Sequence, residues 1–296
     1  MKNLIRFDWA VKRLLRNKAN FGILEGFLSE LTGEDIKIEN ILESESNQES
    51  KYEKFNKVDL LVKNSKDELI IIEVQNNREH DYLLRILFGT SKLLIENMNI
   101  GMAYSQIKKV ISVNIVYFDL GQGNDYIYHG TTSFIGLNNK DILQLSEDEQ
   151  LLYKTDSIAK VYPEYYIIKV NQFNDVANNT LDEWIYFLKR EEIKDEFNAK
   201  GLRQARIELA ILKLSDSERR DYDRYVEQER YEESLIVSNY RVGELRGEIQ
   251  GEIQGEIKGA LKVKIEIAKR CFQKGMPINE IAELTGLSLD AIQNLK

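Results

Sequence analysis

Residues 69–75, with the sequence LIIIEVQ, constrain the fold of this 296-residue chain more than any other feature. Four successive apolar residues of this kind are typical of a central strand that is buried on both faces. Because side chains alternate along a strand, Glu73 and Gln75 share one face, whereas Ile72 and Val74 share the other. A carboxylate that ends a buried strand usually has a partner, since an unpaired buried charge is costly.

A second strand is expected over 55–63, joined to 68–75 by the tight turn at residues 64–67. Asp59 and Glu73 are each seven residues from Lys66, so a hairpin that closes symmetrically there places them opposite each other. Their Cβ atoms would then lie roughly 4.5–5.5 Å apart, where like charges destabilise a sheet. A divalent cation offsets this repulsion, and Mg²⁺ binds both carboxylates and substrate phosphate. The spacing alone leaves open an acidic hairpin with both carboxylates in solvent.

The remaining elements follow from periodicity and from turn residues. We predict helices over 4–20, 21–31 and 81–97, strands over 36–42, 110–118, 126–134 and 165–170, a loop over 43–54, and helix from residue 181 onward. In the third helix the apolar residues recur at helical spacing, at Leu83, Leu84, Leu87, Leu94 and Ile95. Alternation of helices and strands in this order predicts an α/β core.

Asp59 followed by Glu73-Val74-Gln75 at the end of an apolar strand resembles the motif of the PD-(D/E)XK nuclease superfamily. Within it the chain is similar to the transposase-derived, recombination-promoting nuclease group, through residues 7–15, residues 27–31, and Arg85 with the following 91–93. The resemblance covers residues 1 to about 190. It implies a restriction-endonuclease-like αβββαβ core with an all-helical C-terminal tail. It also implies Mg²⁺- or Mn²⁺-dependent hydrolysis of DNA phosphodiester bonds, linked to DNA recombination, transposon ancestry or defence.

The resemblance also implies site residues. Asp59, Glu73 and the backbone carbonyl of Val74 would be metal ligands, and Glu25 would complete the site, with Glu30 as the alternative.

The chain departs from the superfamily at the catalytic lysine, where it has Gln75. Gln75 could orient the attacking water, and Lys63, on the strand face of Asp59, could substitute for the lysine charge. A catalytically degenerate protein that binds DNA or dimerises without cutting is therefore the alternative function.

The distribution of charge along the chain matters more for DNA binding than the net charge does. The total of −8 argues against a nucleic-acid partner, because neutralising phosphates needs Lys and Arg. However, residues 1–20 and 258–274 are each strongly basic. The candidate phosphate contacts are Lys12, Arg13, Arg16 and Arg85. Ordinary solvated helix faces or structural ion pairs explain the same residues equally well.

The tail contains a four-residue repeat with glycines at 243, 247, 251, 255 and 259. Each glycine costs a helix up to about 1 kcal/mol relative to alanine, so the repeat needs compensation from packing. We therefore expect a homodimer seam along this stripe, with a flexible linker as the alternative.

The segment after residue 277 has the spacing of a helix-turn-helix. Ser288 is the expected N-cap of its second helix, and its small core would contain Ile281, Leu284, Leu287 and Leu295. Gln293 and Asn294 would face DNA bases, although the segment could instead pack against a partner.

These expectations divide the chain into a nuclease-like domain (1–190), a helical extension (191–242), a repeat helix (243–262) and a helix-turn-helix-like segment (263–296). Other chemistries are disfavoured. His80, His129 and Cys271 form no spaced zinc motif, and the absence of a Walker A sequence argues against a nucleotide cofactor. No apolar run approaches membrane-spanning length, and one cysteine fits a reducing cytoplasm, so we expect a cytoplasmic location.

Overall fold

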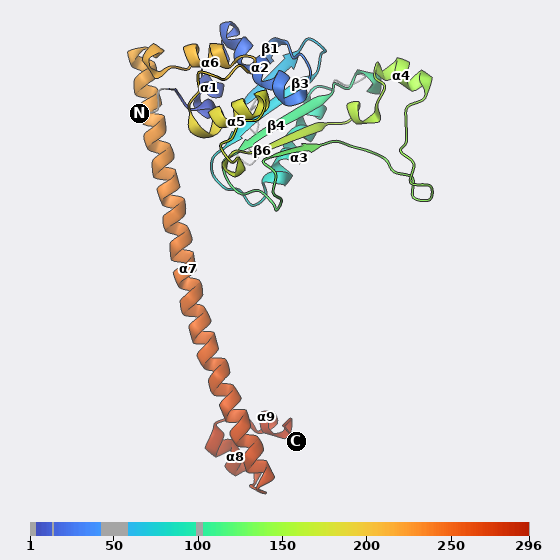
Figure 1. Cartoon of the computed structure of the whole chain (residues 1–296). Helices are drawn as coiled ribbons and strands as arrows, with labels where there is room; N and C mark the ends of the chain where they lie inside the picture. The colour runs from blue at the N-terminus through green and yellow to red at the C-terminus, as the bar shows by residue number, and fades with distance from the viewer. Residues whose placement is uncertain (1–3, 14, 43–58, 99–102, 296) are drawn as a thin grey trace. The chain divides into compact units, whose positions relative to one another are not determined.

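The computed structural model describes residues 4–13, 15–42, 59–98 and 103–295. Its contacts divide the chain into two compact units, Met1–Tyr225 and Val226–Lys296 (Figure 1). The domain boundaries expected at 190, 242 and 262 stay predictions. The loop expected over 43–54 lies outside the described residues.

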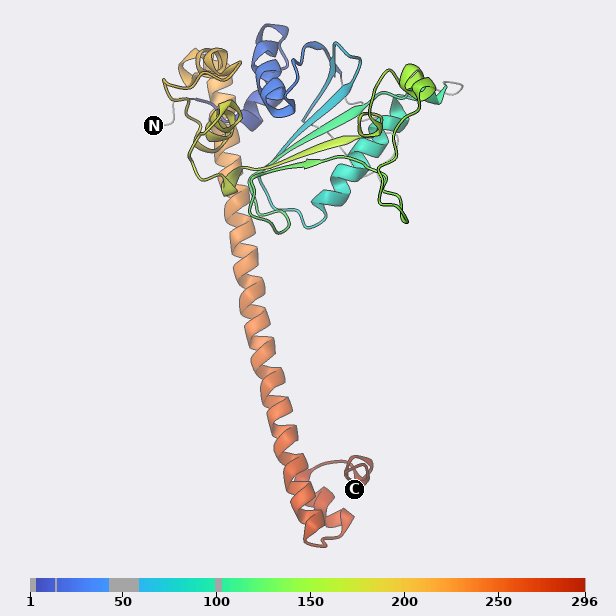
Figure 2. The ribbon, with the colours of Figure 1, turned by 45° about the vertical axis from the view of Figure 1, so that its right-hand side comes forward.

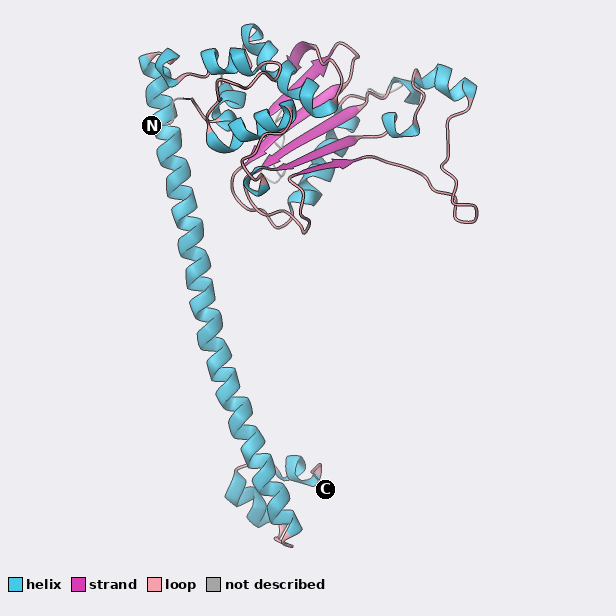
Figure 3. Ribbon diagram, in the orientation of Figure 1, coloured by secondary structure: helices cyan, strands magenta, loops and turns pink. Residues whose placement is uncertain are grey.

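The first unit is built on one mixed sheet (Figure 3). Its strands are β1 (Ile38–Leu42), β2 (Leu60–Asn64), β3 (Leu69–Gln75), β4 (Val110–Val116), β5 (Ile127–Gly130) and β6 (Glu164–Lys169). They lie in the order β1-β2-β3-β4-β6-β5. β3, β4 and β6 are parallel, whereas the pairs β1–β2, β2–β3 and β5–β6 are antiparallel.

The helices are α1 (Phe7–Arg13), α2 (Phe21–Thr32), α3 (Tyr82–Glu96), α4 (Glu147–Tyr153), α5 (Thr180–Arg190), α6 (Leu202–Glu208), α7 (Asp216–Gln273), α8 (Ile278–Thr285) and α9 (Leu289–Gln293). Read along the chain, α2-β1-β2-β3-α3-β4 is the expected αβββαβ order. The predicted fold class, a mixed α/β core with a helical C-terminal tail, is confirmed.

Helices cover both faces of the sheet (Figure 2). On one face α3 packs through Tyr82 and Ile86 against Val116, and through Leu93 against Leu69. Helices α1, α2 and α5 lie on the other side. There Phe7, Phe27, Trp184 and Phe187 form a cluster of edge-on and tilted rings, with centroids 5.4–6.4 Å apart. Such pairs add stabilisation beyond their buried area.

The apolar residues that marked α3 in the sequence are mostly not its buried face. Leu83, Leu84, Leu87 and Ile95 are all more than half exposed. The helix instead buries Tyr82, Ile86, Gly89, Thr90 and Leu93. Tertiary packing therefore buries a different stripe of this helix from the one that most of these apolar residues occupy.

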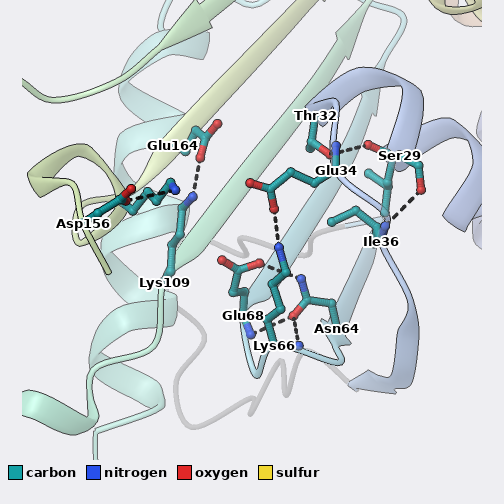
Figure 4. Close-up of polar contacts among 12 residues, drawn as sticks. Ser29, Thr32, Glu34, Ile36, Asn64, Lys66, Glu68, Lys109, Asp156 and Glu164 are labelled. Atoms are coloured by element: carbon teal, nitrogen blue, oxygen red, sulfur yellow. Dashed lines mark hydrogen bonds and ion pairs between the residues drawn. The ribbon is translucent and has the colours of Figure 1, made fainter. Parts of the chain in front are cut away.

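The turn between β2 and β3 fixes the register of the hairpin (Figure 4). Buried Asn64 accepts hydrogen bonds from the N–H groups of Lys66 (3.0 Å) and Glu68 (2.9 Å), and its amide donates to the Glu68 carboxylate (2.7 Å). Asp67 adopts φ 64°, which gives a three-residue loop of a common hairpin type. Leu60 consequently pairs with Ile72, as the symmetric hairpin requires.

Two elements are shorter than predicted by more than a residue or two at their ends. The helix expected over 4–20 ends at Arg13, and Asn17 then caps the short 3₁₀ turn Lys18–Asn20 by accepting from the Ala19 N–H. Such a side-chain bond competes with helix continuation. Strand β5, predicted over 126–134, ends at Gly130. Gly130 pairs with Tyr165, the second residue of β6, so the partner strand offers almost no further residues for pairing. Residues 55–58 of the predicted second strand lie outside the described residues.

The second unit contains most of α7, followed by α8 and α9. Ala268, Ile281 and Ile292 form its buried core, with Leu287 and Leu295 packed against them. Leu284 is 64% exposed, so its predicted core position was wrong. Ser288 caps α9 by accepting from the Ala291 N–H, as predicted. Within the described ranges, every helix is too short or too polar to serve as a membrane span.

Candidate active site

The hairpin brings Asp59 and Glu73 together where β2 begins and β3 ends. Leu60 pairs with Ile72, so the next residues outward, Asp59 and Glu73, are opposite each other. The Asp59 Oδ2 accepts a hydrogen bond from the Val74 N–H over 2.8 Å. This bond anchors the Asp59 carboxylate on β3, immediately beside Glu73.

Glu73 is the electrostatically unusual member of the pair. It is only 6% exposed, and burial, together with the charges of Asp59 and Glu79, raises its pKa to about 7 against the opposing effect of Arg85. Its Oε2 is buried and has no hydrogen-bond partner among the described residues. Arg85 Nε lies 3.9 Å from that oxygen, too far for a hydrogen bond. Glu73 Oε2 therefore has a long ion pair with Arg85 but accepts no hydrogen bond from the described residues.

Gln75 is held by a residue that the sequence did not indicate. Its Nε2 donates to Glu79 Oε1 over 3.0 Å and to the Asn77 carbonyl over 3.1 Å. The same Glu79 oxygen accepts from Arg85 Nη1 over 2.7 Å. Glu79 thus joins β3 to α3 and orients both side chains. Its only signal in the sequence was its position four residues after Gln75.

Basic residues from α1 and from the turn after it contact Asp59. Lys12 Nζ lies 3.4 Å from Asp59 Oδ1, and Arg16 donates to the Asp59 backbone carbonyl over 2.7 Å. Arg13 is exposed on the same segment. Positive charge from the N-terminal basic stripe is therefore adjacent to the carboxylate pair, although more than forty positions separate them in sequence.

Other residues suggested for the site have partners elsewhere. Glu25 accepts from the Ile38 N–H (2.9 Å) and pairs with Lys37 (3.4 Å). Glu30 accepts from Thr180 Oγ1 (2.5 Å). Their roles as metal ligands, like that of the Val74 carbonyl, stay predictions.

Lys63, suggested as a substitute for the missing lysine, pairs with Glu39 (3.0 Å) and Asp67 (3.2 Å). It lies four residues along β2 from Asp59, roughly 13 Å at the usual strand rise. Gln293 and Asn294, suggested for DNA bases, are exposed at the end of α9 in the second unit. Both suggestions stay predictions.

The residues at the site fit a hard divalent cation. Asp59 and Glu73 offer carboxylate oxygens, the ligands that Mg²⁺ prefers, and a cation beside them would offset the charge of the buried Glu73 carboxylate. No group of three or more His, Cys, Asp or Glu that could hold a metal occurs among the described residues. Mg²⁺ also binds water and substrate phosphate, so a pair of protein carboxylates suits this ion.

An αβββαβ core with a carboxylate pair at the start of β2 and the end of β3 is the arrangement of a PD-(D/E)XK nuclease. Residues 5–238 match the family described as PD-(D/E)XK nuclease family transposase, and the chain belongs to this family. Members are usually metal-dependent, and membership in a nuclease family suggests DNA as the substrate. No curated protein and no solved structure matches the chain in the same comparisons.

Proposed function

We propose that this protein is a Mg²⁺- or Mn²⁺-dependent DNA endonuclease that hydrolyses phosphodiester bonds in DNA recombination, transposition or defence. The observation that carries the proposal is the buried Glu73 carboxylate beside Asp59, whose charge is balanced among the described residues only by a 3.9 Å ion pair with Arg85. A buried carboxylate is expensive unless it is neutral, paired or bound to a metal. Together with membership in the nuclease family, this favours a cation site over a structural role.

Each neighbouring side chain has a defined part in the proposal. The cation would stabilise charge on the phosphodiester and activate water. The Gln75 amide, held by Glu79, would orient that water through its side-chain carbonyl oxygen. Lys12 and Arg16, beside Asp59, would contact the DNA phosphates. Arg85 forms an ion pair with Glu79, so its role in the proposal is to hold Glu79 in place rather than to contact DNA.

Nicking of supercoiled plasmid tests the proposal. Wild-type protein with Mg²⁺ or Mn²⁺ should convert the plasmid to open-circular and linear forms, and EDTA should prevent this. Asp59→Asn and Glu73→Gln should abolish the activity. Asp195→Asn is the matched control, because Asp195 is an exposed loop carboxylate whose ion pair among the described residues is with Arg206 on α6. Equal nicking by wild type and Asp59→Asn would overturn the proposal.

A catalytically degenerate DNA-binding protein is the second candidate, and one observation favours it. Gln75 occupies the position of the family's lysine, and both hydrogens of its amide group are engaged by Glu79 and Asn77. Strand β3 itself therefore contributes no positively charged side chain to the site. DNA binding with no metal-dependent nicking, unchanged in Asp59→Asn, would support this candidate instead.

The proposal includes self-association through α7. The repeat glycines have open surroundings, since a methyl group added at any of them meets no atom within 4 Å outside the nearby helix backbone. Ile249, Ile253 and Ile257 are each more than half exposed alongside them. A four-residue spacing turns the stripe by about 40° per repeat, so two straight helices share it only near a crossing point.

Charge indicates the direction of this crossing. Glu248, Glu252 and Glu256 precede Lys258 and Lys262 along α7. A parallel pair in register would align like charges, whereas an antiparallel pair would bring the acidic and basic segments together. We therefore propose an antiparallel crossing of two copies. The helix-turn-helix-like segment, with Gln293 and Asn294 exposed, would give each copy a second contact to DNA.

A further inference from the structure

Three buried polar atoms beneath α3 have no hydrogen-bond partner among the described residues. They are Glu73 Oε2, Asn114 Oδ1 and Tyr82 Oη, from β3, β4 and the first turn of α3. Native proteins leave few such atoms, and each one calls for a ligand, a water or an ion. Three of them on adjacent elements therefore indicate a shared partner.

Asn114 is the neighbour of Glu73 across the sheet. The two residues are register partners in the parallel pair β3–β4, so their side chains point to the same face, on strands about 4.8 Å apart. Asn114 Nδ2 donates to Ser112 Oγ (3.0 Å) and to the Tyr166 carbonyl (3.2 Å) on β6. Because the amide is planar, Oδ1 is turned away from β6 and toward the β3 side, where Glu73 lies.

Tyr82, in the first turn of α3, packs on the same face of the sheet. It is completely buried, and its ring makes an edge contact with Phe118 at 5.7 Å and packs on Val116, two residues beyond Asn114. Burial raises the pKa of Tyr82, and the charge of Glu73 raises it further. The hydroxyl therefore keeps its proton at any physiological pH and remains a donor within electrostatic reach of Glu73.

We infer that Tyr82 and Asn114 are positioning residues that hold Glu73 for the cation through one buried water. The hydrogen bonds balance: the Tyr82 hydroxyl donates to the water, and the water donates to Glu73 Oε2 and to Asn114 Oδ1. Buried waters typically make about three such bonds to otherwise unsatisfied groups. With Oε2 held in this way, Oε1 is the oxygen presented to the cation beside Asp59. This inference rests on the proposed function.

Partners of this kind outside the ligand shell typically change metal affinity by about 10- to 100-fold. Tyr82→Phe removes only the hydroxyl, so we expect it to weaken Mn²⁺ binding to the full-length protein at least about tenfold in titration calorimetry. Tyr117→Phe is the matched control. Its hydroxyl donates to the Leu188 carbonyl over 2.9 Å, away from the carboxylate pair, so its loss should lower the melting temperature without changing Mn²⁺ affinity.

Asn114→Ser gives a second, independent variant if Tyr82→Phe folds poorly, and it should also weaken Mn²⁺ binding. A crystal structure of the wild-type protein should show a water within hydrogen-bonding distance of all three atoms. Wild-type Mn²⁺ affinity in Tyr82→Phe or Asn114→Ser would overturn the inference while leaving the proposed function standing. Failure of the wild-type protein itself to bind Mn²⁺ would instead overturn the proposed function.

Discussion

The backbone N–H of Val74 donates a hydrogen bond to the Asp59 carboxylate over 2.8 Å. Because Val74 directly follows Glu73, this bond fixes one carboxylate beside the other before any ligand arrives. It also leaves Asp59 Oδ1 toward Lys12, at 3.4 Å. The hairpin therefore holds the two carboxylates side by side. The cost in free energy arises mainly at Glu73, because its carboxylate is buried.

The first prediction concerns the stability of the metal-free protein. Glu73→Gln should raise the free energy of unfolding at pH 8, because it removes a buried charge. The shift of the Glu73 pKa to about 7 corresponds to on the order of 3 kcal/mol as an upper value. Urea denaturation in EDTA measures this change. Asp59→Asn, which alters a less buried carboxylate, is the comparison and should not give the same gain.

The second prediction is a pH dependence. The pKa of Glu73 is raised in the folded state, so the native protein holds this proton while the unfolded chain has lost it. The Glu73 contribution should therefore lower stability as pH rises from about 4.5 to about 7 in the metal-free protein. Mn²⁺ affinity should rise over the same range, since the cation displaces the proton. Both trends should vanish in Glu73→Gln, and a persisting trend would assign them to another group.

The third prediction tests the turn that sets the register. Asn64→Ala removes three hydrogen bonds at a buried position, which should lower the free energy of unfolding by about 1–3 kcal/mol. It should also reduce the Mn²⁺-induced rise in melting temperature, because Asp59 and Glu73 depend on this register. Ser65→Ala, an exposed substitution in the same turn, is the control. An unchanged Mn²⁺ response in Asn64→Ala would show that the strands hold their register without the turn.

The fourth prediction tests the α7 crossing. Replacing Gly251 and Gly255 with alanine should raise helix propensity by roughly 1 kcal/mol per site yet weaken self-association, because the added methyl groups keep two helices apart. Sedimentation equilibrium measures the association and circular dichroism the helix content. Replacing Gln250 and Gln254 with alanine changes the same turns outside the glycine stripe and serves as the control. Stronger association in the glycine variant would contradict close helix contact.

The fifth prediction concerns the end of the chain. Ser288→Ala removes the N-cap of α9 and should destabilise the small core around Ile281 and Ile292 by about 1 kcal/mol. Hydrogen exchange of α8 and α9 in the full-length protein should quicken, while exchange in β3 and β4 should not. Ser288→Thr retains a capping oxygen and should stay close to wild type. Unchanged exchange in Ser288→Ala would show that core packing alone holds α9.

Local patterns were sufficient for the hairpin and for the carboxylate pair. The apolar run before Glu73 predicted a buried strand, and the equal spacing of Asp59 and Glu73 from Lys66 predicted their alignment. The geometry of a turn depends on only a few neighbouring residues, so the local sequence determined this hairpin. The order of helices and strands, and the cap at Ser288, followed from the same short-range rules.

Only the tertiary structure decided what surrounds the pair. Lys12 reaches Asp59 across forty-seven positions, and Asn114 reaches the Glu73 face because β4 pairs beside β3. The buried stripe of α3 was also chosen by packing, which exposed Leu84 and Leu87 and buried Tyr82. Periodicity reports which residues of a helix share a face, but burial depends on the surface that the helix meets. That surface is assembled from distant segments, so no local pattern encodes it.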